Sequence, residues 1–233
     1  MKIKKLYLYG GLIILALIIA AVVYYKPFSR EDTLVIDADE KRPEWAVDNN
    51  GYLSYPLDRG TVKFSRADLE ANNSILVSKI IFQSRGANIY GLLATPTSAE
   101  ILPPGIVLLP GAGVSKESEL ELAKDIAQLG AAVLVIDQRG VGETTGQINS
   151  IEQDYLDFLN AEEPTQHLMV YDALRAYDLL NQAPFIDSER VIIAGESLGG
   201  RIATIAAAID RNIGGVLIIS SSGFDFKDKG DIG

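Results

Sequence analysis

Residues 191–209 read VIIAGESLGGRIATIAAAI, and this stretch decides the fold. Val191–Ala194 is a short apolar run, typical of a strand that is covered on both faces. Leu198–Ile209 predicts a helix that starts directly after this strand. Between them, Gly195-Glu196-Ser197-Leu198-Gly199 matches the pattern G-x-S-x-G. A turn of this kind lifts the serine hydroxyl above the edge of the sheet, so Ser197 is predicted to be a nucleophile.

The same alternation of strand and helix continues on both sides of this stretch. Further apolar runs predict buried strands at Gly105–Leu109, Ala131–Ile136 and Val216–Ile219. One helix, with Ser118 and Glu121 at capping-box spacing, is expected to end at Gly130, and another to begin near Gln166. Such alternation indicates βαβ units, and therefore a parallel sheet with helices on both faces.

An antiparallel hairpin is predicted ahead of these units, where the β-rich runs Val77–Ser84 and Asn88–Ala94 are joined by Arg85-Gly86-Ala87. The fold class is therefore α/β, with a mostly parallel sheet, and residues 76–233 are assigned to this domain. Residues 26–75 are polar and interrupted by Pro, Gly and Asn, so they are assigned to a linker with a short helix at Arg66–Ala71.

Composition excludes several kinds of function. The 233 residues carry 31 acidic and 21 basic side chains, and this acidic balance argues against nucleic acid as a partner. No cysteine is present, so disulfides, thiolate catalysis and Cys-ligated metals are excluded. His167 is the single histidine, which rules out a site that needs two imidazoles. No metal and no cofactor is expected.

The N-terminus predicts a membrane anchor. Residues 6–25 are uncharged, and about 20 helical residues span roughly 30 Å, the thickness of a hydrocarbon core. Lysines at positions 2, 4 and 5 place the tail 1–5 in the cytoplasm, so a single-pass protein would hold its later domain outside. A cleaved signal peptide and a buried soluble helix are the alternatives, although the bulky exit Val22–Tyr25 is unlike a small-x-small cleavage site.

Backbone N–H groups around Ser197 are candidates for an oxyanion hole. The N–H of Leu198, the residue after the nucleophile, is the first predicted donor. The second is expected from the loop after the first parallel strand, Pro110–Val114, with Ala112 as the best single residue. The alternative for this loop is a glycine-rich turn without a catalytic role.

From Val77 to about Phe224 the chain resembles α/β-hydrolases of the prolyl-oligopeptidase and dienelactone-hydrolase type. The resemblance is carried by the hairpin followed by LLPGAG, by the loop Asp137–Gly142 and by GESLGG. It implies a serine hydrolase that cleaves a small ester, amide or peptide through an acyl-enzyme. One departure is Pro110, where many relatives have a histidine.

The resemblance also implies an acid and then a histidine after Ser197, in later strands. This chain offers Asp225, a weak candidate for the acid, and no later histidine. His167 precedes the serine and lies one turn before Val170 on an apolar stripe, so we expect it to be half-buried and structural. The chain is therefore expected to stop after the sixth strand of its fold and to be inactive alone.

Without further strands, Val216–Ile219 would be an apolar sheet edge, open to a completing chain. Two alternatives to a hydrolase remain. One is a catalytically inactive α/β-hydrolase-like protein, either a decayed gene product or a binding module. The other is a nucleotide-binding protein, but Gly140-x-Gly142 lacks the G-x-G-x-x-G spacing that a dinucleotide site needs.

Overall fold

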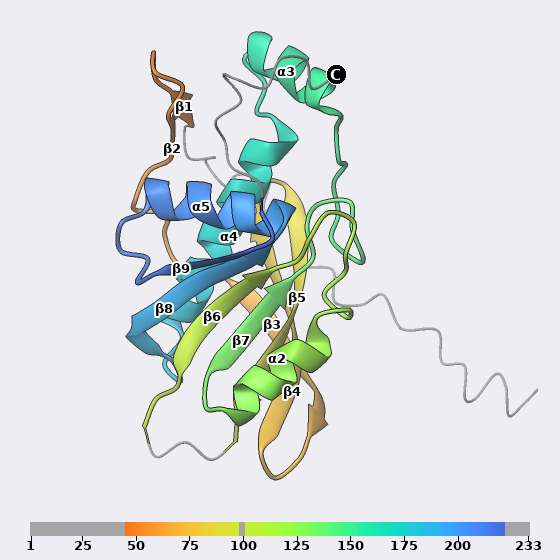
Figure 1. Ribbon diagram of the computed structural model, residues 1–233, viewed down its shortest axis with the longest axis vertical. Helices are drawn as coiled ribbons and strands as arrows, with labels where there is room; N and C mark the ends of the chain where they lie inside the picture. Colours follow the sequence, from red (N-terminus) through yellow and green to blue (C-terminus); the bar gives the residue numbers. More distant parts are fainter. Residues whose placement is uncertain (1–44, 98–100, 222–233) are drawn as a thin grey trace, which may run out of the picture. The chain divides into compact units, whose positions relative to one another are not determined.

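The computed structural model describes residues 45–97 and 101–221 (Figure 1). A seven-stranded sheet has the order β3-β4-β5-β7-β6-β8-β9, and a two-stranded hairpin, β1-β2, precedes it in the chain. The strands are β1 Ala46–Val47, β2 Leu53–Ser54, β3 Phe64–Ala71, β4 Ile75–Ser84, β5 Ala87–Pro96, β6 Pro104–Leu109, β7 Ala132–Ile136, β8 Asp187–Glu196 and β9 Val216–Ile219. The helices are α2 Leu120–Gln128, α3 Ile151–Leu159, α4 Thr165–Gln182 and α5 Leu198–Ile209.

The sheet divides into an antiparallel and a parallel part. Strands β3, β4 and β5 form an antiparallel meander, and β5 pairs with β7 in the antiparallel direction. Strands β7, β6, β8 and β9 are parallel to one another. The predicted hairpin and the predicted parallel strands are therefore confirmed, and the carboxyl ends of the parallel strands meet at one edge, where the loops that carry Ser197 and Ala112 begin.

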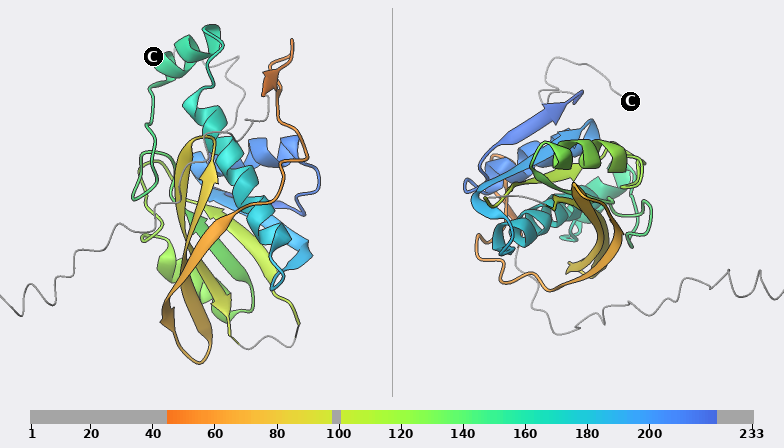
Figure 2. Two further views of the ribbon diagram at one scale, coloured as in Figure 1. Left: turned by 180° about the vertical axis from the view of Figure 1, so that it is seen from behind. Right: turned by 90° about the horizontal axis from the view of Figure 1, so that it is seen from below.

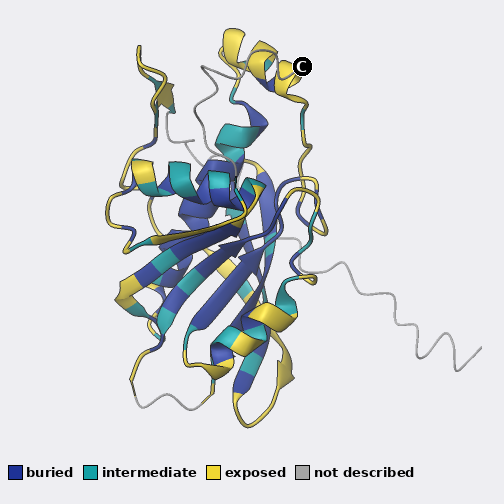
Figure 3. Cartoon of the chain, in the orientation of Figure 1, coloured by how far each residue is buried: buried dark blue, intermediate teal, exposed yellow. Residues whose placement is uncertain are grey.

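Helices cover both faces of the sheet, as the alternation predicts (Figures 1 and 2). On one face Val107 and Leu134 pack with residues of α4 and α5 in the larger core cluster. On the other face Val133 and Val135 pack with Ala123 of α2. Neighbouring strand residues point to opposite faces, so a strand covered on both faces is apolar along its length, as the fully buried β7 is (Figure 3). Strand β9, at the edge of the sheet, is apolar but exposed.

Two local predictions need correction. Arg66–Ala71 belongs to β3 and not to a helix, because its backbone pairs with β4, for example Arg66 with Ile80. Most side chains of β3 are exposed, so the local sequence carries no apolar alternation that would have identified a strand. The capping box is also absent: α2 begins at Leu120 with Glu119 at the N-cap, whose side chain makes no capping hydrogen bond.

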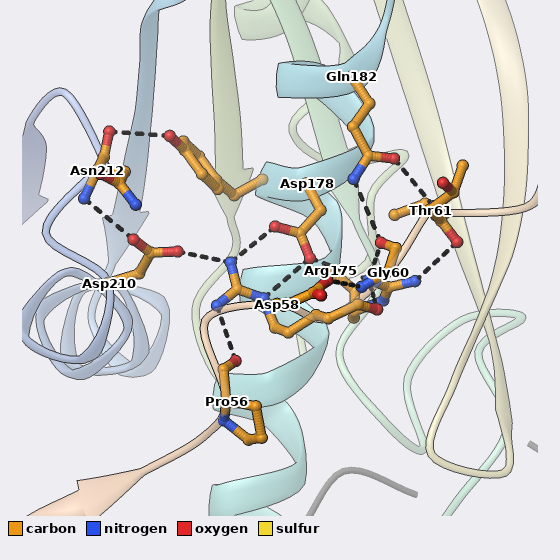
Figure 4. Close-up of polar contacts among 12 residues, drawn as sticks. Pro56, Asp58, Gly60, Thr61, Arg175, Asp178, Gln182, Asp210 and Asn212 are labelled. Atoms are coloured by element: carbon orange, nitrogen blue, oxygen red, sulfur yellow. Dashed lines mark hydrogen bonds and ion pairs between the residues drawn. The ribbon is translucent and has the colours of Figure 1, made fainter. Parts of the chain in front are cut away.

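The segment before β3, predicted to be a linker, is fastened to the domain by a buried ionic cluster (Figure 4). The Arg59 guanidinium donates to Asp178 of α4 over 2.9 and 2.7 Å and to Asp210, at the end of α5, over 2.6 Å. Arg175 of α4 donates to the carbonyl oxygens of Arg59 and Gly60 at 2.6 and 3.0 Å. A cavity of about 490 Å³ lies beside this cluster, but the polar side chains of the cluster already bind one another.

The predicted anchor at residues 6–25 lies outside the described residues, as does Asp225. In the two described ranges no helix has both the length and the apolar character needed to cross a membrane.

Candidate active site around Ser197

Ser197 occupies a sharp turn between β8 and α5. Its φ of 51° and ψ of −112° lie in a backbone region that residues other than glycine rarely adopt, and the residue is exposed. A Cβ added to Gly195 would collide with the backbone of Gly199, and one added to Gly199 would collide with the Leu109 carbonyl. The glycines therefore let strand, turn and helix pass one another, as the G-x-S-x-G pattern predicts.

Strand β9 supports the turn from the other side. The N–H of Ser197 donates to the carbonyl of Ile219 over 2.9 Å. A Cβ added to Gly200, in the first turn of α5, would lie 3.0 Å from both the Ile218 and the Ser221 side chains. The backbone that presents the serine is thus held between β8, α5 and the end of β9.

The start of α5 supplies N–H groups next to the serine. Leu198 is the first residue of the helix, and the first N–H groups of a helix have no partner within it. The Ser197 side chain makes no capping hydrogen bond among the described residues, so it does not occupy them. The helix N-terminus also carries a partial positive charge, which favours an anion at this position.

The loop after β6 lies against the turn. A Cβ added to Gly111 would be 3.7 Å from the Ser197 Cβ and 3.9 Å from the Glu196 carbonyl oxygen. Ala112 follows directly and is exposed. The structure therefore brings together the three segments that hold Ser197, Leu198 and Ala112; the roles of the two N–H groups stay predictions.

A second loop, after β7, holds the first one in place. The side chains of Lys116 and Asp137 form a fully buried ion pair with 2.7 Å between Nζ and Oδ2. Burial alone would lower the pKa of the Lys116 ammonium, but hydrogen bonds to Asp137, Glu117 and Glu143 outweigh it and raise that pKa above its ordinary value. Gln138 donates to the carbonyl of Pro110 over 2.8 Å. Sequence reasoning gave no role to Lys116 or to Gln138, although Gln138 lies in the loop Asp137–Gly142 that carries the resemblance.

His167 does not act on Ser197 in the described residues. It is half-buried, as predicted, and its ring packs edge-on against Trp45 and Phe158, with centroids 5.4 and 6.4 Å away. Burial lowers the pKa of this imidazole. Its Nδ1 has no hydrogen-bond partner within residues 45–97 and 101–221, and no bond between His167 and Ser197 is formed there. The same ranges contain no group of three or more His, Asp or Glu side chains suited to a metal ion.

Known proteins are similar to this chain over part of their length. The polyketide transferase af380 of Aspergillus fumigatus is 27% identical over 128 residues, which are 54% of this chain and 40% of that protein. An acetyl xylan esterase from Paenibacillus sp. R4 superposes with a TM-score of 0.63 and 21% identity, over 80% of this chain and 64% of that one. Acetyl xylan esterase 1 from Thermoanaerobacterium sp. JW/SL YS485 gives a TM-score of 0.58 and 18% identity, over 66% and 51%.

The chain thus spans less than half the length of the curated relatives that it matches and between half and two thirds of these solved structures. At such identities the superpositions show the fold alone, and that fold is α/β-hydrolase-like. The expected resemblance to α/β-hydrolases is confirmed. The profile of the acetyl xylan esterase (AXE1) family matches residues 58–227, and this chain therefore belongs to that family.

Proposed function

We propose that this chain carries the nucleophile of a serine esterase that cleaves small esters, with acetyl esters as the first class to test. The observation that supports it most is the exposed Ser197 at φ 51°, placed beside the first N–H groups of α5, in a member of the acetyl xylan esterase family. Strained backbone residues cluster at functional sites, and the strand-to-helix turn of a G-x-S-x-G motif presents the serine hydroxyl to a substrate.

The reaction follows from this geometry in two steps. The Ser197 Oγ attacks the ester carbonyl, and its proton passes to a general base and then to the leaving alcohol. The carbonyl oxygen becomes an oxyanion that accepts hydrogen bonds from the N–H groups of Leu198 and Ala112. Water then attacks the acyl-serine, which releases the carboxylic acid and restores the hydroxyl.

His167 does not serve as the general base in the described residues, since it is packed against Trp45 and Phe158. Base and acid would come from a segment beyond residue 221 or from a completing chain. Strand β9 offers a place for either, because its outer edge is free in the described sheet and Val216–Ile219 are each 41–52% exposed. On its own the chain would be inactive or nearly so.

A fluorophosphonate probe and an aryl acetate test the proposal on the full chain and on any longer product of the same reading frame. Labelling at Ser197 that disappears in Ser197→Ala but persists in Ser118→Ala, a change of an exposed serine in the neighbouring loop, supports it. If the longer product is also unlabelled and inactive, the second candidate holds: a catalytically inactive α/β-hydrolase-like protein, which the lack of a histidine beside Ser197 favours.

Attachment to a membrane through residues 6–25 is a further part of the proposal, with the N-terminus cytoplasmic and the domain outside the cytoplasm. It is supported by the uncharged run and the preceding lysines. Alkaline carbonate should leave the full chain in the membrane pellet and release a chain that starts at residue 27. Recovery of the full chain in the supernatant would exclude the anchor.

A further inference from the structure

We propose that Gln138 is a positioning residue for the oxyanion loop, which acts by fixing the peptide group between Pro110 and Gly111. The inference rests on the proposed function of Ser197. Its basis is one contact: Gln138 Nε2 donates to the Pro110 carbonyl over 2.8 Å, and the Gln138 side chain is buried. Only the NH₂ end of the amide can donate to a carbonyl, so the contact also defines the orientation of this side chain.

Planarity of the peptide transmits this contact to the site. The C=O and N–H of one trans peptide point in opposite directions, so a bond that holds the Pro110 carbonyl also fixes the direction of the Gly111 N–H. The next peptide is held in the same way, because the N–H of Val114 donates to the Gly111 carbonyl over 3.2 Å, which fixes the Ala112 N–H. Both peptide groups that flank Gly111 are therefore oriented where the loop touches Ser197.

The other end of the Gln138 amide, Oε1, indicates that the glutamine is present for its NH₂ donor and not for packing alone. Oε1 is buried and has no hydrogen-bond partner in the part of the chain that the structure describes. A buried acceptor without a partner is unfavourable, and an apolar side chain could fill the same space without that penalty. A residue selected only for packing would not carry the amide.

Lys116 anchors the same loop at its far end. Its backbone N–H donates to Asp137 Oδ1 and its ammonium to Oδ2, both over 2.7 Å. Adjacent residues of one loop, Asp137 and Gln138, thus hold residues 110 and 116 of the other. Asp137 fixes the far end of the loop, whereas Gln138 binds the peptide between Pro110 and Gly111, beside Ser197.

Three variants separate positioning from packing. Gln138→Met keeps the size of the side chain but removes the donor, and Gln147→Met, at an exposed position of the same loop, is the matched control. In Gln138→Glu a neutral carboxyl group can still donate to the Pro110 carbonyl, whereas the carboxylate repels it. The charged groups that face a carboxyl group at residue 138 are Asp137 and Asp172, which line the same small cavity as Gln138. Each is already paired with a cation, Asp137 with Lys116 and Asp172 with Arg139.

The first readout is the rate of fluorophosphonate labelling of the longest active form, together with kcat and KM for an aryl acetate. Gln138→Met is expected to lower the labelling rate and kcat about 10-fold, with KM and the melting temperature close to those of Gln147→Met. For Gln138→Glu, the ratio of the variant rate to the wild-type rate at the same pH should approach one as pH falls and decrease as pH rises. Equal rates in Gln138→Met and Gln147→Met would overturn the proposal.

The second readout needs no activity and uses the full chain. The ¹H–¹⁵N amide signals of Gly111 and Ala112 should shift in Gln138→Met and stay in place in Gln147→Met. If the wild type is never labelled but these signals shift, the proposed function fails while the positioning contact stands. If the signals do not shift, Gln138 does not position the loop, whatever the activity.

Discussion

The Lys116 ammonium and the Asp137 carboxylate lie 2.7 Å apart, and neither side chain has any exposed surface. The pair joins the loop after β6 to the loop after β7, and Glu143 adds its N–H to the same carboxylate over 3.1 Å. Asp137 therefore organises both loops beside Ser197. Loss of its buried cationic partner, Lys116, should for this reason disturb both loops.

Lys116→Met should lower the free energy of unfolding by about 3–5 kcal/mol, because it leaves the Asp137 carboxylate buried without its cation. Urea denaturation measures the loss. Combining the change with Asp137→Asn should cost less than the sum of the two single changes, since the pair acts as a unit. Lys124→Met, which removes surface ion pairs with Glu70 and Glu121, is the control and should change little.

Gly199→Ala should be more damaging than Gly130→Ala. The added methyl group at residue 199 meets the Leu109 carbonyl, so about 3 kcal/mol or more is expected from overpacking against backbone. At residue 130 the surroundings are open and only the φ of +99° is strained, at about 1–2 kcal/mol. Thermal and urea unfolding compare them, and a smaller loss for Gly199→Ala would contradict the close approach of α5 to β6.

Arg59→Ala should destabilise the domain by about 3–5 kcal/mol, since it removes the cation shared by the buried carboxylates of Asp178 and Asp210. Arg59→Lys should recover part of this loss, because an ammonium keeps the charge but not the planar fork of donors. Equal losses in both variants would show that the fork, and not the charge, holds the segment. Arg190→Ala, at an exposed ion pair with Asp187, is the control.

The stability of the domain should depend on His167 between about pH 7 and pH 5. Burial lowers the pKa of this imidazole below its ordinary 6.5, so below pH 6.5 the unfolded chain binds a proton that the folded chain does not. Stability therefore falls as pH drops through this window, by at most about 1.4 kcal/mol per pH unit for one proton.

His167→Phe keeps an aromatic ring against Trp45 and Phe158 and removes the titration, so its unfolding free energy should be flatter over the same window. The difference between the two proteins cancels carboxyl groups such as Glu163, whose pKa burial raises. Equal pH dependence in wild type and variant would show that the imidazole is free to take up its proton in the folded state.

The parallel part of the fold was predictable from local sequence. Helix Leu198–Ile209 and strand Val216–Ile219 have the predicted bounds, because the turn at Ser197 must be flanked by glycines and the strand is one continuous apolar run, although the structure leaves that run exposed at the edge of the sheet. Strand β3 was not predictable: its polar residues become a strand only because β4 offers a partner. The short helix α3, Ile151–Leu159, also escaped prediction, since its apolar side chains are mostly exposed and show no buried stripe.

The site shows the same division. Ser197 and its glycines follow from a motif whose spacing reflects one turn of backbone. The contacts that organise the surrounding loops join residues far apart in the chain, such as Gln138 with Pro110 and Arg59 with Asp210, 28 and 151 positions apart. A single sequence holds no record of such pairs, so they appear only in three dimensions.

The hydrogen bond from the Ser197 N–H to the Ile219 carbonyl joins the turn that carries Ser197 to β9, the last strand of the described sheet. A strand added along the outer edge of β9 would restrain the same four residues whose inner side carries the serine. The direction of the Ser197 hydroxyl therefore depends on β9, and order gained or lost along the outer edge of β9 would reach Ser197 through the single residue Ile219.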